Sequence, residues 1–218
     1  MLRPRKILEV GNSGLLFLVF ITIFIVPVLP LTWQELAFPI FFTLIFLISA
    51  TALQTQQKNI FILAVTLTVI NLASDIFGMA ILDRIFTYLT LIFFVIIVIK
   101  LIIQIARVKK VTAQVILEAI NSYLLLGMAF ATIIRVTVNI NPEAFSFKSP
   151  IITDGTVSNF SEILYFGFVT MTTLGYGDVV PLTPVAKSIA MLTAVGGQIY
   201  IAVIIALLVG KYAGANDE

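Results

Sequence analysis

Residues 170–181 read Thr-Met-Thr-Thr-Leu-Gly-Tyr-Gly-Asp-Val-Val-Pro and decide how the second half of the chain folds. The apolar segment that leads into them, 160–173, is shorter than the ~20 residues that a helix needs to cross a bilayer. Gly175 and Gly177 occupy alternate positions, and glycine adopts left-handed backbone conformations without steric cost. We therefore expect a short re-entrant helix, followed by a non-helical stretch that turns back. Such backbone is tolerated at membrane depth only where protein or a water-filled pore covers it.

The composition indicates a protein whose natural solvent is lipid. Of the 218 residues, 60% are hydrophobic and 11% are charged, and the mean hydropathy is +1.13. A soluble domain is nearer half apolar and a quarter charged. The absence of cysteine and histidine removes disulfides, thiolate metal sites and the usual acid–base side chain. We expect an integral membrane protein that is not an enzyme, uses no organic cofactor and does not bind nucleic acid.

Six segments are long and apolar enough to cross a membrane, which predicts the all-α class. They are 14–31, 37–54, 60–81, 85–105, 113–138 and 185–210. Pro27, Pro30 and Pro39 are expected to flank the first hairpin, and Asp83-Arg84 to form a tight turn after the third span. The N-terminal segment is interpreted as a retained span, with a cleaved signal peptide as the alternative.

Basic residues divide unequally between the two sides of these spans, which predicts the orientation. One side carries Arg3, Arg5, Lys6, Lys58, Lys100, Arg107, Lys109, Lys110 and Lys211. The other carries Arg84, Arg135, Lys148 and Lys187. The excess predicts a multi-pass protein of the cell membrane with both termini in the cytoplasm and the re-entrant loop outside.

The stretch Thr173-Leu174-Gly175-Tyr176-Gly177 resembles the potassium-channel signature, in which each of four subunits supplies a Thr-Val-Gly-Tyr-Gly loop. Leu174 stands where valine is usual. The resemblance implies that the carbonyl groups of Thr173, Leu174, Gly175 and Tyr176 replace the hydration shell of K⁺ ions in a selectivity filter. The Thr173 hydroxyl adds a ligand at the inner end, and Tyr176 is expected to pack against the short helix.

Three further residues are expected to support this filter: Thr172 before it, Asp178 after it and Tyr165 on the short helix. Val169 occupies the place where some related channels carry a carboxylate that bonds the aspartate. Tyr165 is the candidate donor to Asp178 in its stead. The alternative interpretation is an ordinary Gly-Tyr-Gly turn in an outer loop.

Residues 118–127 and 197–203 are similar to the pore domain of a bacterial potassium-channel family with four extra helices before a two-helix pore. The resemblance implies a pore domain at 107–218 and a four-helix unit at 1–106, in the position of a voltage sensor. It also implies a homotetramer, in which the partners of each chain are three further identical subunits and membrane lipid. The segment 85–105 carries only Lys100, so strong voltage gating is not expected. The sequence does not predict the stimulus that opens the pore. It also does not predict whether the front helices, those of residues 1–106, swap between subunits.

Two features of the spans have alternative interpretations. The resemblance places a gating hinge at Gly197, beside Gly196, whereas helix packing alone also explains both glycines. Ile201 and Ile205 follow at i+4 and i+8 and are expected to line or constrict an inner cavity. Asp75 is an intramembrane carboxylate with a functional role, or a group near the outer end that is hydrated or pairs with Arg84.

These observations together predict passive, potassium-selective conduction across the membrane. One alternative is a subunit of a potassium uptake transporter, although such proteins usually carry four degenerate loops within a single chain. A weakly selective cation channel is another. The single near-ideal loop in this chain favours a symmetric assembly of identical subunits.

Overall fold

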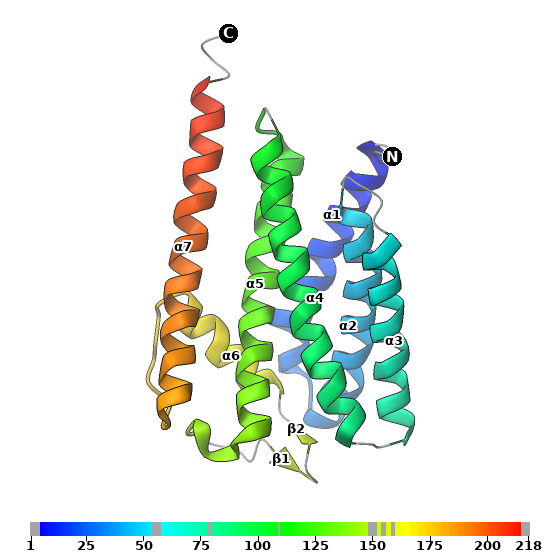
Figure 1. The fold of residues 1–218 in the computed structure, drawn as a ribbon, viewed down its shortest axis with the longest axis vertical. Coiled ribbons are helices and arrows are strands. Elements are labelled where there is room, and N and C mark those ends of the chain that lie inside the picture. The colour runs from blue at the N-terminus through cyan, green and yellow to red at the C-terminus, as the bar shows by residue number, and fades with distance from the viewer. Residues whose placement is uncertain are drawn as a thin grey trace.

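The computed structural model is an elongated bundle of helices that lie side by side (Figure 1). It describes residues 5–53, 58–77, 80–108, 110–147, 152–153, 156–157 and 160–214. The described part of the first half folds as α1 (Arg5–Phe20), α2 (Leu31–Ala52), α3 (Lys58–Phe77) and α4 (Ala80–Arg107). Between α1 and α2 the chain forms a π-helical turn, Ile21–Ile25, and a 3-10 turn, Val26–Val28.

The second half begins with α5 (Ala113–Ile140) and a 3-10 turn, Pro142–Ala144. Two short antiparallel strands follow, β1 (Ile152–Thr153) and β2 (Thr156–Val157). The chain then forms the short helix α6 (Phe160–Met171) and the long helix α7 (Pro184–Gly214). The fold is helical as expected, apart from this hairpin, which the sequence analysis did not predict.

Among the described residues, five helices are long and apolar enough to cross a membrane: α1 with the turns after it, α2, α4, α5 and α7. These helices indicate a multi-pass membrane protein. α3 contributes a shorter apolar stretch, Lys58–Ile70, so a total of six spans stays a prediction. The 12 residues of α6 make it too short to cross, as expected for a re-entrant segment.

Two expected span boundaries were wrong. Asp83-Arg84 does not form a turn, because α4 begins at Ala80 and includes both residues near its N-terminus, where an acidic residue favours the helix dipole. Pro39 does not flank a hairpin but lies inside α2, which begins directly after Pro30. Proline inside a membrane helix is tolerated because neighbouring groups satisfy the freed backbone carbonyls.

The ends of the helices fall into two groups along the bundle (Figure 1). α1 begins, α4 ends, α5 begins and α7 ends at one end of it, whereas α6 and the β-hairpin lie in the other half. Of the basic residues counted for orientation, Arg3, Lys109 and Lys148 lie outside the described residues, as do the side chains of Arg5 and Lys6. The side chain of Asp75 is also outside them.

An aromatic core joins α2 and α4 to α6. Phe46 of α2 packs edge-on against Phe93 of α4, with ring centroids 4.8 Å apart. The rings of Phe38 and Phe42 of α2 pack against the ring of Phe160, the first residue of α6, with centroid distances of 5.2 and 5.6 Å. Edge-on aromatic pairs of this kind add about 0.5–1.5 kcal/mol each beyond the burial of their area. The front helices thus hold the N-terminal end of the helix that leads to residues 170–181.

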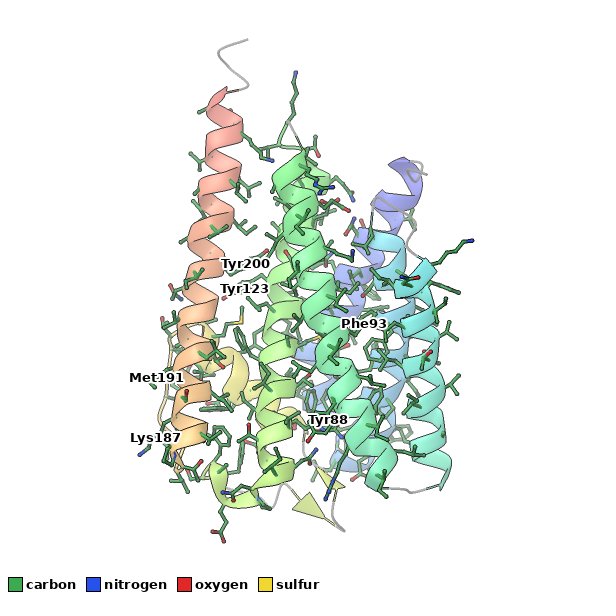
Figure 2. All side chains as sticks on the ribbon, in the orientation of Figure 1. Tyr88, Phe93, Tyr123, Lys187, Met191 and Tyr200 are labelled. Atoms are coloured by element: carbon green, nitrogen blue, oxygen red, sulfur yellow. The ribbon has the colours of Figure 1, made fainter. Side chains whose placement is uncertain are left out.

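α7 stands at the edge of the bundle, where it contacts α5 and α6 and leaves its other face uncovered (Figure 1). Only 22% of its spanning window is buried, against 56% for α5. Lys187 and Met191 project from this outer helix in Figure 2, and Met191 is 63% exposed. The outer face of α7 is therefore available to lipid or to other protein chains.

Candidate functional site

The residues that follow α6 close this helix with a Schellman motif. The Thr173 N–H donates to the Thr170 carbonyl at 3.0 Å, and the Leu174 N–H donates to the Val169 carbonyl at 3.0 Å. In this motif the residue between the helix and the free chain takes a left-handed conformation. Thr173 fills that position with φ +63°. The motif fixes the direction in which the chain leaves α6.

Left-handed backbone then recurs at every second residue of the predicted filter. Gly175 has φ +55° and Gly177 has φ +77°. Together with Thr173 they make three alternate left-handed positions within five residues, as the predicted carbonyl alignment requires. The two glycines adopt this conformation freely, whereas a β-branched residue such as threonine does so rarely and under strain. Strained backbone of this kind clusters at functional sites.

Asp178, directly after the predicted filter, is bonded to α6. The Tyr165 hydroxyl donates to Asp178 Oδ2 at 2.7 Å, and the Val179 N–H donates to Asp178 Oδ1 at 3.1 Å. Tyr165 on α6 thus acts as the donor to this carboxylate. The structure thus brings together two of the residues expected to support the filter.

Thr172, the third of these residues, has a more local role. Its hydroxyl donates to the Phe168 carbonyl of its own helix at 2.8 Å. The same carbonyl also accepts the Thr172 N–H at 2.9 Å, so backbone and side chain of Thr172 both bind the end of α6.

A second set of hydrogen bonds holds the chain beyond Asp178, and it was not predicted from the sequence. The Ser146 N–H donates to the Val180 carbonyl at 2.9 Å, and the Val180 N–H returns a bond to Ser146 Oγ at 3.1 Å. The Leu182 N–H donates to the Ala144 carbonyl at 2.8 Å. These bonds join two segments that are distant in the sequence, and neither segment shows a pattern that predicts them.

The predicted filter, Thr173–Gly177, is open on the surface of a single chain. Leu174 is 55% exposed and Tyr176 is 66% exposed. A Cβ atom added to Gly175 or Gly177 would meet no atom within 4 Å. The expected packing of Tyr176 against the short helix is therefore not made within one chain.

The two central glycines of α7 both lie at close contacts. A Cβ atom on Gly197 would overlap the Met171 carbonyl oxygen and lie 2.6 Å from Met171 Cγ, at the end of α6. A Cβ atom on Gly196 would lie 2.6 Å from the ring of Phe130 on α5. α7 continues as a helix through both residues. Gly196 and Gly197 were predicted from the sequence, whereas Met171 was not, because its place before the predicted filter and against Gly197 depends on tertiary packing.

The residues predicted to line an inner cavity follow on the same helix. Ile201 is half-buried against a cluster formed by α4, α5 and α7, and Ile205 is 55% exposed. Tyr200, directly before Ile201, is buried, with its hydroxyl donating to the Ala119 carbonyl of α5 at 2.7 Å. Figure 2 shows Tyr200 beside Tyr123 in the space between the two helices.

Comparison with known families agrees with this geometry. Residues 122–213, which include most of α5, all of α6, the filter and nearly all of α7, match the family model described as ion channel. The match indicates an ion channel and points to a protein that is not an enzyme. No curated protein and no solved structure matches the chain.

Replacing Tyr165 by phenylalanine is expected to loosen the outer end of the filter. Asp178 loses the hydroxyl donor on α6 but keeps the Val179 N–H. In single-channel recordings the variant should conduct for a smaller fraction of the time, with its ion preference unchanged. Tyr212→Phe, at an exposed residue near the end of α7, is the matched control. Equal conducting times in the two variants and the wild type would show that this bond does not support the filter.

Proposed function

We propose that four copies of this chain form a potassium-selective channel of the cell membrane, with the segment Thr173–Gly177 of each copy lining one selectivity filter. The observation that carries the proposal is the series of left-handed residues at Thr173, Gly175 and Gly177. An extended strand points its carbonyl groups alternately to two sides, whereas this alternation lets them point to one side. A column of carbonyl oxygens can then replace the water shell of K⁺.

The proposal of several copies follows from the exposed filter. Non-helical backbone at membrane depth needs a cover of protein or a lining of water, and one chain supplies neither for Leu174 and Tyr176, which are 55% and 66% exposed. The uncovered face of α7 supplies an apolar surface that further copies would bury. A ring of four loops also places each Tyr176 ring beside a neighbouring subunit, which would provide the packing that is missing within one chain.

The short helix contributes to the electrostatics of the proposed filter. α6 ends at Met171, directly before the filter, and the C-terminus of a helix carries about half a negative charge. Four such ends around one axis would favour a cation at the inner entrance of the filter. The hydroxyl of Thr173 would add a ligand at the same level.

Gly197 and the residues after it would form the inner part of the pore. The close contact between Gly197 and Met171 favours a packing role for this glycine over a hinge alone. Ile201 and Ile205 follow on the same helix and would line the cavity below the filter. Both termini would then lie in the cytoplasm, in agreement with the excess of basic residues at that end.

The alternatives differ from this proposal in subunit number and in ion preference. An uptake transporter of the kind considered above would usually carry four filter loops in one chain, and a weakly selective cation channel would conduct Na⁺ nearly as well as K⁺. Purified protein should therefore be cross-linked in detergent and in liposomes to count subunits. The same liposomes should release K⁺ by a flux that Ba²⁺ blocks. A monomer, or equal fluxes of K⁺ and Na⁺, would contradict the proposal.

Voltage should change the open probability of this channel only weakly. Within α4 the basic residues are Arg84, Lys100 and Arg107, with Arg84 and Arg107 near the two helix ends. A charge that crosses the whole membrane field contributes about 2.3 kcal/mol per 100 mV, and strong sensors move three or four per subunit. Voltage steps on reconstituted channels should therefore produce a shallow change in open probability. A steep, sigmoidal response would show that α4 carries a sensor.

A further inference from the structure

Lys211, in the last turn of α7, is bonded to the end of a helix from the other half of the chain. Its ammonium group donates to the Ile105 carbonyl at 2.6 Å, the Ala106 carbonyl at 2.8 Å and the Val108 carbonyl at 2.5 Å. An ammonium group has three N–H donors and no acceptor, so every donor of Lys211 is used.

Two of the three acceptors, the Ile105 and Ala106 carbonyls, belong to the open end of α4, and Val108 directly follows this helix. This helix ends at Arg107, and the last four carbonyls of a helix have no partner within it. They also form the negative end of the helix dipole, where a cation is stabilised. Lys211 therefore satisfies carbonyls that would otherwise need water, and it does so from a helix more than 100 residues further along the chain.

An apolar cluster next to Lys211 makes the same connection. It contains Ile105 from α4, Val115 and Ala119 from α5, and Tyr200 and Ile204 from α7, all buried, and it is separate from the main core. Tyr200 and Ile204 share one face of α7 with Lys211, because residues 11 and 7 positions apart lie close to whole numbers of turns. The end of α7 is thus joined to the end of α4 by both apolar packing and hydrogen bonds.

We propose that Lys211 is a positioning residue that holds the end of α7 outward, against α4, and so favours the conducting state of the pore. This inference rests on the proposed function. The opposite face of α7, which carries Met191, Val195 and Val209, is 57–63% exposed at these residues. In a tetramer that exposed side faces the other copies and the axis. The bonds from Lys211 to the end of α4 therefore pull the end of α7 away from the axis and widen the inner mouth of the pore. Through this one lysine, the front helices set the width of the pore.

Single-channel recordings on full-length protein in bilayers test this role. Lys211→Met keeps the length and apolar stem of the side chain but removes the charge and all three donors. We expect the ratio of open to closed time to fall at least about tenfold, which corresponds to about 1.4 kcal/mol, with the preference for K⁺ unchanged. Lys211→Arg retains the charge, but its planar donors match three carbonyls less well, so it should restore the ratio in part.

The matched control is Lys110→Met, which removes one charge from an exposed residue of the linker between α4 and α5 at the same end of the bundle. It should behave as the wild type. An unchanged or higher open ratio in Lys211→Met would overturn the proposal, as would an equal fall in the Lys110→Met control.

A distance measurement separates this proposal from the proposed function. The chain has no cysteine, so single cysteines introduced at Ala106 and Tyr212 can carry spin labels without background. In protein reconstituted in liposomes, Lys211→Met should lengthen and broaden the distance between the two labels, whereas Lys110→Met should not. This result is independent of any current. If the wild-type protein shows no selectivity for K⁺, the channel proposal alone is refuted. If the label distance is unchanged in Lys211→Met, the role of Lys211 alone is refuted.

Discussion

Replacing Gly177 or Gly175 by alanine is expected to abolish potassium-selective current while leaving the helices folded. Both residues have positive φ, +77° and +55°, and a left-handed conformation costs an L-residue about 1–2 kcal/mol. The space around each Cβ position is open within the chain, so the penalty comes from the backbone and not from a collision. In the proposed tetramer the four penalties add up to about 4–8 kcal/mol, which the proposed filter can avoid by turning its carbonyls away from the axis.

Gly14→Ala is the control for this prediction. Gly14 lies in α1, and a Cβ atom there would make ordinary contacts of 3.9 and 4.0 Å with Ile48. Alanine should be tolerated at this position and slightly favoured in a helix. Circular dichroism would verify folding, and ion fluxes would report selectivity. Unchanged preference for K⁺ over Na⁺ in both filter variants would refute the assignment of the filter.

Replacing Gly197 by alanine is expected to reduce assembly and current together. The added Cβ would overlap the Met171 carbonyl oxygen and lie 3.2 Å from the Met171 carbonyl carbon. A backbone atom cannot rotate out of the way as a side chain can, so α7 or the end of α6 has to move. Overpacking of this kind costs about 1–3 kcal/mol, and a shift of α6 displaces the Schellman motif that starts the filter.

Gly210→Ala in the same helix is the matched control, because a Cβ atom at Gly210 would meet nothing within 4 Å. Size-exclusion chromatography and thermal unfolding should show a loss for Gly197→Ala and none for Gly210→Ala. The two interpretations of Gly197 predict different results here. If Gly197 acts only as a hinge, alanine should leave assembly and stability intact and change the open probability alone.

The sequence was most informative where a local rule decides the structure. The alternation of Gly175 and Gly177 was predicted from residue types, and the structure has positive φ at both. Thr173 also has positive φ, which was not predicted. The long apolar helices follow from hydropathy, and their ends were less predictable. Asp83-Arg84 reads as a turn by its charge, yet it lies near the N-terminus of α4, where the helix dipole favours an acidic residue such as Asp83.

The contacts between distant segments could not be predicted from the sequence. Ser146 and Val180 pair across 34 positions, and Lys211 reaches the end of α4 across more than 100. Ser146 and Lys211 belong to no sequence motif, and either polar side chain is equally compatible with a place in water. In the sequence, Met171 is not distinguished from the other apolar residues of the short helix. Its contact with Gly197 depends on the packing of α6 against α7.

The most direct test of the central claim is the reversal potential of single channels in a planar bilayer, with K⁺ on one side and Na⁺ on the other. Carbonyl groups aligned along Thr173–Gly177 predict a reversal potential displaced far from zero, in the direction that corresponds to K⁺ permeation alone. A reversal potential near zero in these solutions would contradict the account, because it would mean that both ions pass equally.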